Sequence, residues 1–284
     1  IVPWAPGGST DQVTRVLARA AEARLGQPIV VVNKPGASTA IGMGEVAAAK
    51  PDGYTLGTMS STSYLVALQG RALPFDPIDG FSYVSYIGEN LIGIAVRADS
   101  PWQTLADLVA EGRKRRLTFG TGGVGSTQHL TAEALKAATG ANFVHVPQQG
   151  SAGSMPALLG RHVDFIAEVS VWAPFVESGE VRLLAVATPK RSAAYPKVPP
   201  LAESGVQSLR SVQAIVAPKG LPEPIRMRLE TAFRQSLSDP AFIEAMRRLR
   251  MEIIDLSGSE VRAMLDQEYA RGRELIAQSR KPGG

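Results

Sequence analysis

Four loops rich in glycine and hydroxyl side chains carry the clearest chemistry in this sequence. They span 6–11, 33–42, 121–129 and 147–154, and each comes directly before a segment with helical periodicity. Glycine lets backbone N–H groups turn toward a ligand, and a helix N-terminus adds partial positive charge, so such loops suit carboxylate or phosphate oxygens. One such loop would indicate only a tight turn, but four in matching positions indicate a binding site. Their hydroxyl-bearing residues are Ser9, Thr10, Ser38, Thr39, Ser126, Thr127 and Ser151.

One of these loops also suits a different ligand. Gly120–Gly125 matches the G-x-G-x-x-G pattern of dinucleotide-binding enzymes, between a predicted strand and a predicted helix. Such a site also needs an acidic residue at the end of the next strand, which here reads Val146-Pro147-Gln148-Gln149. The loop has the spacing of a Walker sequence but lacks its lysine. An NAD(P)-dependent oxidoreductase that uses Gly120–Gly125 therefore stays the alternative function.

The sequence offers no convincing catalytic or metal-binding set, so we predict no cofactor and no metal. Absence of cysteine excludes thiolate metal sites and cysteine nucleophiles. The three histidines, His129, His145 and His162, lack metal-ligand spacing, and we expect His129 to pack or cap. No G-x-S-x-G nucleophile motif occurs. Asp11 could act as a base, but its place at a helix start beside two glycines favours a loop-holding role.

Length and composition indicate a compact protein of more than one domain. A chain of 284 residues corresponds to about two domains, and its 44% hydrophobic and 20% charged residues are typical of globular proteins. No apolar run approaches the ~20 residues that a membrane-spanning helix needs. The net charge of +4 is small, and basic residues are not interleaved with aromatic ones, so no nucleic-acid partner is predicted.

The elements that must position the loops alternate between strand and helix. A strand ending at Trp4, which we expect to be cut short at its start with a leader missing, precedes a helix over 9–25. A strand over 29–32, a helix over 41–49 and a strand over 54–59 follow. The β-branched run 29–32 is typical of a strand covered on both faces of a parallel sheet. In this order the loops after the strands meet at the carboxyl edge of the sheet, where ligands bind.

The pattern restarts near residue 100, which predicts a second unit. Pro-marked helix starts follow the strands near Ile94 and Ile215, so we predict two hinge crossings. Lobe 1 then comprises 1–97 plus 213–284, and lobe 2 comprises 98–212, with a cleft between their sheet edges. The fold class is α/β, with two doubly wound sheets. The other predicted strands are 83–87, 91–96, 117–119, 143–146, 163–167, 182–187 and 212–217, and the other predicted helices are 101–111, 127–139, 154–159, 172–178, 224–238, 240–249 and 258–278.

Several motifs in order resemble the Bug (TctC-like) family of solute receptors. They are Pro3 to Asp11 (PWAPGGSTD), Asn33 to Ala37 (NKPGA), Pro51 to Leu56 (PDGYTL), Leu73 to Pro77 (LPFDP), Gly122 to His129, His145 to Pro147, and Leu158 to Gly160. The resemblance covers essentially the whole chain. It implies a two-lobe periplasmic-binding-protein (Venus flytrap) fold and a monomeric periplasmic receptor that is not an enzyme. Its implied partners are a small organic acid and the two integral membrane subunits of a tripartite tricarboxylate transporter.

The resemblance also implies which residues bind the ligand. In the family, the loops matching 6–11 and 33–42 grip one carboxylate through backbone groups and ordered waters, and segments matching 121–127 and 147–151 complete the cage. Carried over by position, the expected ligand-binding residues are Pro6, Gly7, Gly8, Ser9, Asp11, Ala37, Ser38, Thr39, Thr121, Gly125, Ser126, Thr127, Gln148, Ser151 and Glu168.

This chain departs from the usual family pattern at three places. The family commonly reads Val-Pro-Tyr-Lys-Gly where this chain has Val146 to Gly150, and Asp-Asn near Glu168-Val169. Ala37-Ser38-Thr39 replaces a usual glycine-rich stretch. A basic and an aromatic group are thereby lost and hydroxyls are gained, so the distal end of the ligand is expected to be uncharged or hydroxylated.

Overall fold

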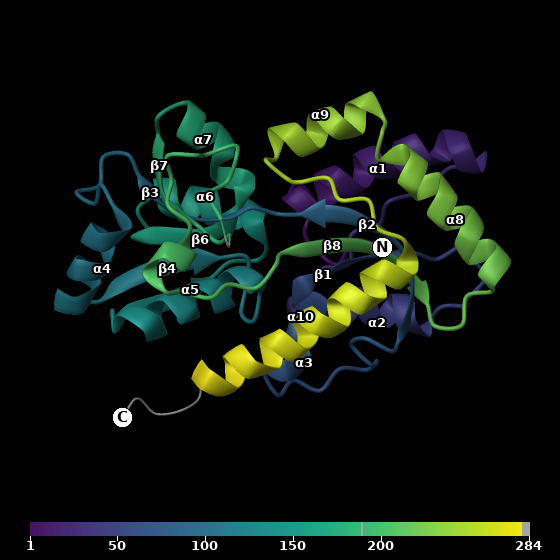
Figure 1. Cartoon of the computed structure of the whole chain (residues 1–284), viewed down its shortest axis with the longest axis horizontal. Coiled ribbons are helices and arrows are strands. Elements are labelled where there is room, and N and C mark those ends of the chain that lie inside the picture. Colours follow the sequence, from purple (N-terminus) through teal and green to yellow (C-terminus); the bar gives the residue numbers. More distant parts are fainter. Residues whose placement is uncertain (189, 280–284) are drawn as a thin grey trace. The chain divides into compact units, whose positions relative to one another are not determined.

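The chain folds into two compact units. The computed structural model describes residues 1–188 and 190–279. Unit 1 comprises Ile1–Asn90 and Ser211–Gly272, and unit 2 comprises Leu91–Arg210 with the end of the chain from Arg273. No helix within the described ranges is long and apolar enough to cross a bilayer. Figure 1 follows the chain through both units.

The crossings between the units come slightly earlier in the chain than the predicted boundaries at 97 and 213. Strand β3 (Ile92–Arg97) pairs with two strands of unit 2, so the residues from Leu91 onward belong there. The final helix, α10 (Gly258–Ser279), begins in unit 1, and its last residues belong to unit 2. The chain therefore crosses between the units near 90, near 210 and again within α10.

Unit 1 is built on a three-stranded antiparallel sheet with the order β1-β8-β2. On one face, Val13 and Leu17 of α1 pack with Ile215 and Ala217 of the central strand and with Phe233 of α8. Helix α2 packs on β1 and β8. The elements are α1 (Ser9–Leu25), a short 3₁₀ turn η1 (Ala37–Thr39), α2 (Ala40–Ala48), β1 (Gly57–Ser60), α3 (Ser61–Leu68), β2 (Phe81–Glu89), β8 (Val212–Pro218), α8 (Glu223–Ser236), α9 (Pro240–Arg248) and the start of α10.

The expected parallel strand over 29–32 is wrong. Among the described residues, strand pairing here is limited to one isolated parallel bridge at the next residue, Val2↔Asn33, with hydrogen bonds from the Val2 N–H to the Val32 carbonyl (2.8 Å) and from the Lys34 N–H to the Val2 carbonyl (2.8 Å). Val30 is 80% exposed. A β-branched run can therefore serve as an exposed edge, and the sheet of unit 1 is antiparallel where a parallel one was expected.

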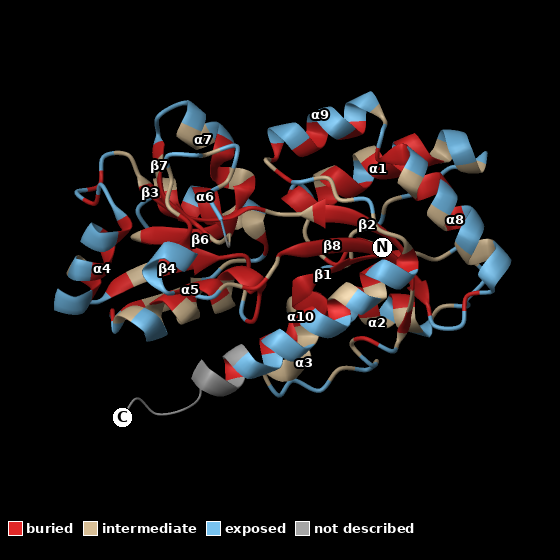
Figure 2. Cartoon of the chain, in the orientation of Figure 1, coloured by how far each residue is buried: buried red, intermediate tan, exposed pale blue. Residues whose placement is uncertain are grey.

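Unit 2 matches the predicted doubly wound architecture more closely. Its five-stranded sheet has the order β5-β4-β6-β3-β7, with β4 parallel to β5 and β6, and β3 antiparallel to β6 and β7. Apolar clusters lie on both faces, one with α4 and α5 and the other with α6 and α7. Figure 2 shows the buried strands and the helices with one buried side. The elements are β3, α4 (Leu105–Lys114), β4 (Leu117–Thr121), α5 (Thr127–Thr139), β5 (Phe143–Pro147), α6 (Ser151–Leu159), β6 (Phe165–Val169), η2 (Ser170–Trp172), α7 (Ala173–Glu177), β7 (Val181–Val186) and η3 (Leu201–Ser204).

Candidate functional site

The two predicted loops of unit 1 are joined through one carboxylate. Asp11 Oδ2 accepts a hydrogen bond from the Gly7 N–H (2.9 Å), while Oδ1 accepts from Asn33 Nδ2 (2.8 Å) and from Arg15 Nε (3.0 Å). Asn33 Nδ2 also donates to the Trp4 carbonyl (3.0 Å). The structure thereby brings loop 6–11 and loop 33–42 together, as the sequence predicted.

The hydrogen bonds of the Asp11 carboxylate hold these loops together. Burial alone would raise the pKa of Asp11, but hydrogen bonds from Arg15, the Gly7 N–H and Asn33 lower it below its usual range. The carboxylate is 5% exposed and has three donors. This arrangement agrees with the loop-holding role and leaves little acceptor capacity for a proton from a substrate.

The start of α1 presents backbone donors without a side-chain cap. Its N-cap is Gly8, which forms no side-chain hydrogen bond, and the preceding Gly7 has φ of 85°, a conformation that favours glycine. Ser9 and Thr10, in the first turn, are buried. The first N–H groups of a helix have no partner within it, so this end suits an anionic oxygen.

The second loop holds three strained residues and an unpaired hydroxyl. Ala37, Ser38 and Thr39 have positive φ values of 47°, 51° and 79°, a region in which residues other than glycine cost free energy. Thr39 is 1% exposed, and its Oγ1 has no hydrogen-bond partner. It precedes α2, whose start also lacks a side-chain cap. Strain and an unpaired buried hydroxyl at a helix start together indicate a ligand site.

In unit 2, two histidines hold the loop between β4 and α5. His145 Nε2 lies 2.7 Å from Thr121 Oγ1, and the Gly125 N–H donates to His129 Nδ1 (3.1 Å). The two imidazole rings are stacked with centroids 4.1 Å apart, and Phe119 stacks on His145 at 5.0 Å. His129 thus packs and holds the loop, as expected.

Both imidazoles are kept neutral by their surroundings. Burial lowers the pKa of His129, and burial together with the neighbouring His129 lowers the pKa of His145 to about 3. Ser126 is also engaged, because its hydroxyl donates to the Gly123 carbonyl (2.8 Å) and accepts from the His129 N–H (3.2 Å) as the N-cap of α5. The loop is therefore held by several hydrogen bonds and carries no charge from its histidines.

Glu168 lies beneath both loops of unit 2 and is fully buried. Its Oε2 accepts from the Val169 N–H (2.7 Å) and Gln128 Nε2 (3.2 Å), and its Oε1 accepts from the Ser154 hydroxyl (3.0 Å). The Ser151 side chain also forms a hydrogen bond to Glu168. Burial raises the pKa of Glu168 to about 7, against the effect of these donors. The carboxyl group connects β6, α5 and α6.

The loops of unit 2 are also joined by their backbones. The Gln148 N–H donates to the Thr121 carbonyl (2.9 Å), and the Gly150 N–H donates to the Gly122 carbonyl (2.9 Å). Helix α6 begins after Gly150 without a side-chain cap. Gln148 donates its Nε2 to the Val146 carbonyl (3.1 Å). The structure therefore joins loop 6–11 to Asn33 through Asp11 in unit 1, and in unit 2 it joins the loops 121–129 and 147–154 through their backbones and Glu168.

Sequence reasoning missed one polar residue at the site of unit 1. Gln213, in β8, is fully buried and donates Nε2 to Thr10 Oγ1 (3.1 Å) and to Asn90 Oδ1 (3.2 Å). The available signal was a lone amide in the apolar run from Val212 to Ala217.

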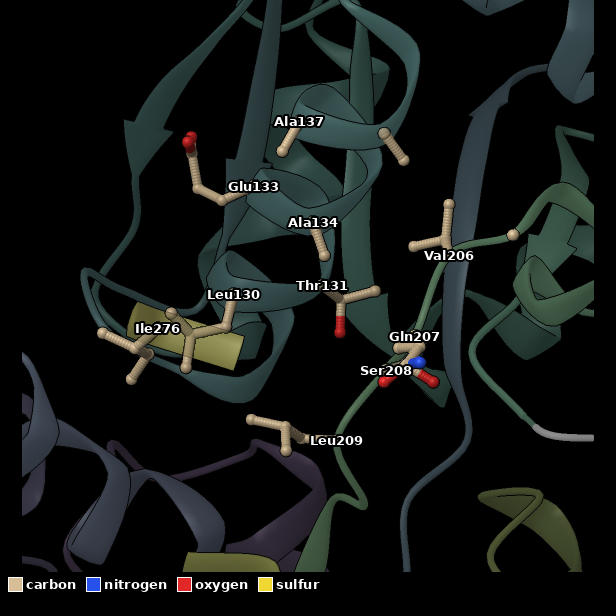
Figure 3. A pocket seen from close by; sticks show the side chains of 12 residues that line it. Leu130, Thr131, Glu133, Ala134, Ala137, Val206, Gln207, Ser208, Leu209 and Ile276 are labelled. Atoms are coloured by element: carbon tan, nitrogen blue, oxygen red, sulfur yellow. The ribbon is translucent and has the colours of Figure 1, made fainter. Parts of the chain in front are cut away.

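A cavity of about 270 Å³ in unit 2 involves none of the expected residues. Leu130, Thr131 and Ala134 of α5 line it together with the segment 205–209 and Ile276, as Figure 3 shows. Most of its lining side chains are apolar and several are small, unlike those of the polar loops described above. Among the described residues, no group of three or more His, Cys, Asp or Glu could hold a metal ion.

Comparison with known proteins identifies the family. The family model described as the tripartite tricarboxylate transporter family receptor, TctC, matches residues 13–280. The UPF0065 protein in gbd 5'region of Cupriavidus necator is 37% identical over 255 residues, which cover 89% of this chain and 78% of that protein. Two solved structures cover 98% of this chain and 95% of their own. They are periplasmic binding protein BugD, at 30% identity and a TM-score of 0.91, and R. palustris Rpa4515 with adipate, at 29% and 0.92. The chain therefore belongs to the TctC family of tripartite tricarboxylate transporter receptors, and it has the two-lobe fold of periplasmic binding proteins.

Proposed function

We propose that this chain is a periplasmic receptor that binds a small organic acid by a carboxylate group and delivers it to the membrane subunits of a tripartite tricarboxylate-type transporter. The observation that carries this proposal is the arrangement in unit 1, where the uncapped starts of α1 and α2 accompany the unpaired, buried hydroxyl of Thr39. Family membership and the adipate in the Rpa4515 structure support an acid as the ligand class.

The proposed binding uses uncharged donors. Backbone N–H groups at the start of α1 and the hydroxyls of Ser9, Ser38 and Thr39 supply hydrogen bonds to one carboxylate, helped by the helix dipole. Asp11 does not contact the ligand in this scheme but keeps Gly7 and Asn33 in place. Pro6 and Ala37 are exposed, and in this scheme they contribute through the backbone conformation that they give the two loops.

Unit 2 carries a second set of polar groups that suits an acid in this proposal. The uncapped start of α6 at Ser151, the amide of Gln148 and the loop Thr121–Thr127 offer polar groups without a basic side chain. Ser126 acts by holding the loop, because its hydroxyl is already engaged twice. Glu168 supports both loops from beneath.

A receptor is favoured over the dinucleotide-dependent enzyme. The residue after β5 that would hold ribose hydroxyls is Gln148, which bonds the Val146 carbonyl, and the Gly120–Gly125 loop is fastened to two neutral histidines. The Asp11 carboxylate at the site of unit 1 already accepts three hydrogen bonds, which leaves it little capacity to act as a base.

Thermal unfolding with a panel of acids tests the binding proposal. A ligand present at a hundred times its Kd stabilises the folded state by about 2.7 kcal/mol, which is a clear rise in Tm. The panel includes mono-, di- and tricarboxylates, aromatic acids, amino acids and NAD. A rise with one class of acid is expected, whereas a rise with NAD alone would restore the enzyme hypothesis.

A matched pair of variants then locates the site by titration calorimetry. Thr39→Val keeps the shape of the β-branched side chain but removes the unpaired hydroxyl. Affinity for the acid should therefore fall about five- to tenfold. Thr139→Val removes a hydroxyl that bonds the Leu135 carbonyl at the end of α5, and it should leave affinity unchanged. Equal affinities of wild type and Thr39→Val would remove Thr39 from the site.

Delivery is tested by uptake of the radiolabelled acid found in the screen. Cells that carry the receptor and its transporter subunits should accumulate the acid, and deletion of the receptor alone should abolish accumulation. Uptake that is unaffected by the deletion would contradict the transport role while leaving the binding role intact.

A further inference from the structure

We infer that Gln213 is a specificity-determining residue whose side-chain carbonyl accepts a hydrogen bond from the bound acid. This inference rests on the proposed function and narrows it to acids that carry a hydroxyl or ammonium group besides the carboxylate. Its basis is one unpaired acceptor atom in unit 1, Gln213 Oε1.

The position of Gln213 follows from the register of the central strand. Its side chain shares a face of β8 with Ile215 and Ala217, which pack with Val13 and Leu17 of α1. Gln213 stands two residues before Ile215, toward the start of the strand, and there it reaches Thr10 in the first turn of α1. The amide thus lies where the apolar core ends and the candidate anion site begins.

Neighbouring groups fix which way the amide points. Asn90 Nδ2 donates to the Ser211 carbonyl (3.4 Å) and to its hydroxyl oxygen (3.3 Å), and a carbonyl can only accept. The other end of the Asn90 amide, Oδ1, therefore faces Gln213 and must receive a donor, which is Nε2 at 3.2 Å. Reversing the Gln213 amide would place two carbonyl oxygens against each other.

This orientation leaves Oε1 without a donor. Gln213 is fully buried, and Oε1 has no hydrogen-bond partner. Nine-tenths or more of buried polar groups in proteins are paired, and an unpaired one is costly, so a bound molecule is expected to supply an O–H or N–H here. A hydroxyl or an ammonium group meets this need, and a second carboxylate does not.

Thr10 connects this acceptor to the carboxylate site. Because the Thr10 hydroxyl oxygen accepts from Gln213 Nε2, its own hydrogen remains able to donate. Thr10 lies in the first turn of α1, whose start has no side-chain cap. One ligand with a carboxylate and a nearby donor would therefore satisfy the helix start and Gln213 Oε1 together.

Three sets of acids that differ by one group test the inference in the intact chain. The sets are succinate, L-malate and L-aspartate; glutarate, 2-hydroxyglutarate and L-glutamate; and 3-phenylpropionate, 3-phenyllactate and L-phenylalanine. By calorimetry, wild type should bind a hydroxy or amino member at least about tenfold more tightly than the unsubstituted acid of the same set. The hydroxy and amino arms distinguish the two sources of the donor.

Substitutions at two positions separate the acceptor from the rest of the network. Gln213→Met has a similar volume but no carbonyl, and it should reduce the preference to near onefold. Gln213→Asn, with a shorter amide, serves the same purpose if the Met variant does not fold. The matched control Ser211→Ala removes one of the two acceptors of Asn90 Nδ2 but keeps the backbone carbonyl that orients Asn90, so Oε1 stays in place and the preference should persist.

The outcomes separate failure of this inference from failure of the proposed function. Equal affinities within every set in wild type, or an unchanged preference in Gln213→Met, would overturn the role of Gln213 while leaving carboxylate binding in place. Binding of none of the nine acids would overturn the proposed ligand class and this inference with it.

Discussion

Glutamine in place of Glu168 should remove a pH-dependent loss of stability. Burial raises the pKa of Glu168 to about 7, against an ordinary value of 4.5. The folded state therefore holds this proton more tightly than the unfolded state, and stability falls as pH rises from 4.5 to about 7. The difference between these values corresponds to about 3 kcal/mol.

The structure indicates why the Glu168→Gln variant should fold. Oε2 receives two N–H donors, from Val169 and Gln128, so the amide oxygen of the substituted side chain should take this place. Oε1 receives the hydroxyl of Ser154, and the Ser151 side chain also bonds this carboxylate. Both hydroxyls can rotate and accept from the new NH₂ group, which has two hydrogens. The variant therefore keeps a paired network without a titrating group.

Urea unfolding at pH values from 4.5 to 8.5, followed by tryptophan fluorescence, measures the effect. Trp172 donates its indole N–H to the Glu168 backbone carbonyl (2.8 Å) and so reports on this region. The variant should gain about 3 kcal/mol over wild type as pH rises through the window. As a control, Ser154→Ala removes a donor to the ionised form and should extend the window to higher pH. A difference between wild type and Glu168→Gln that does not change with pH would refute the reasoning.

Four further outcomes are expected. Asp11→Ala should lower the free energy of unfolding by about 1–3 kcal/mol because three donors lose their acceptor. Since the pKa of Asp11 is lowered in the folded state, its stabilising contribution should be present above pH 3.8 and disappear as pH falls below that value. Urea unfolding of wild type and variant at pH 3 and pH 7 would show this. The ring protons of His145 should not shift in NMR spectra between pH 5 and 8, since its pKa is lowered to about 3; a midpoint inside that range would contradict its burial. Gly88→Ala should destabilise unit 1 by more than about 2 kcal/mol in thermal unfolding, because φ is 146° and a Cβ would collide with the Glu252 carbonyl; a loss under about 0.5 kcal/mol would show that the strand can shift. Affinity for the acid should change less than about threefold between 20 and 500 mM NaCl, because the proposed donors are uncharged; a tenfold loss in calorimetry would indicate a cation in the site.

Local signals predicted most of the helices and the loops before them. The apolar spacing from Val13 to Leu25 and the stop at Gly26 define α1, and Gly26 does adopt the left-handed conformation that ends a helix. The glycine-rich turns 6–11 and 121–127 were found for the same reason, since the residues that allow the turn are themselves the signal. Asp11 was likewise identified as a loop-holding group.

Long-range pairing was harder to predict. The β-branched residues of the run 29–32 predict a covered strand, but exposure depends on which segments lie beside it. Among the described residues, strand pairing here is limited to one parallel bridge at the next residue, Asn33. The antiparallel partners of β8 lie about 120 to 160 residues away, at β1 and β2. Nothing in a local window specifies such partners.

Unpaired atoms were beyond the sequence for a similar reason. Gln213, Asn90 and Thr10 are far apart in the chain, and only the fold shows that both neighbours of the Gln213 amide bond its Nε2 and leave Oε1 without a donor. The Thr39 hydroxyl could be noted as a candidate, but its lack of a partner depends on how the neighbouring segments pack around it. Both observations concern the absence of a hydrogen-bond partner, and a pattern of residue types does not encode such an absence.

In the proposed binding scheme, the charged groups at both candidate sites hold the loops and do not contact the ligand. Asp11 neutralises Arg15 and fastens Gly7, Lys34 pairs with Glu45 at 3.3 Å, and Glu168 is surrounded by neutral donors. A carboxylate bound here would interact with oriented dipoles in place of a counter-ion. The energy of such an interaction depends more on direction than the energy of an interaction with a cation does. Selectivity would then come from matching each hydrogen-bond donor and acceptor of the acid, which is why a single unpaired atom, Gln213 Oε1, can decide between acids that differ by one hydroxyl.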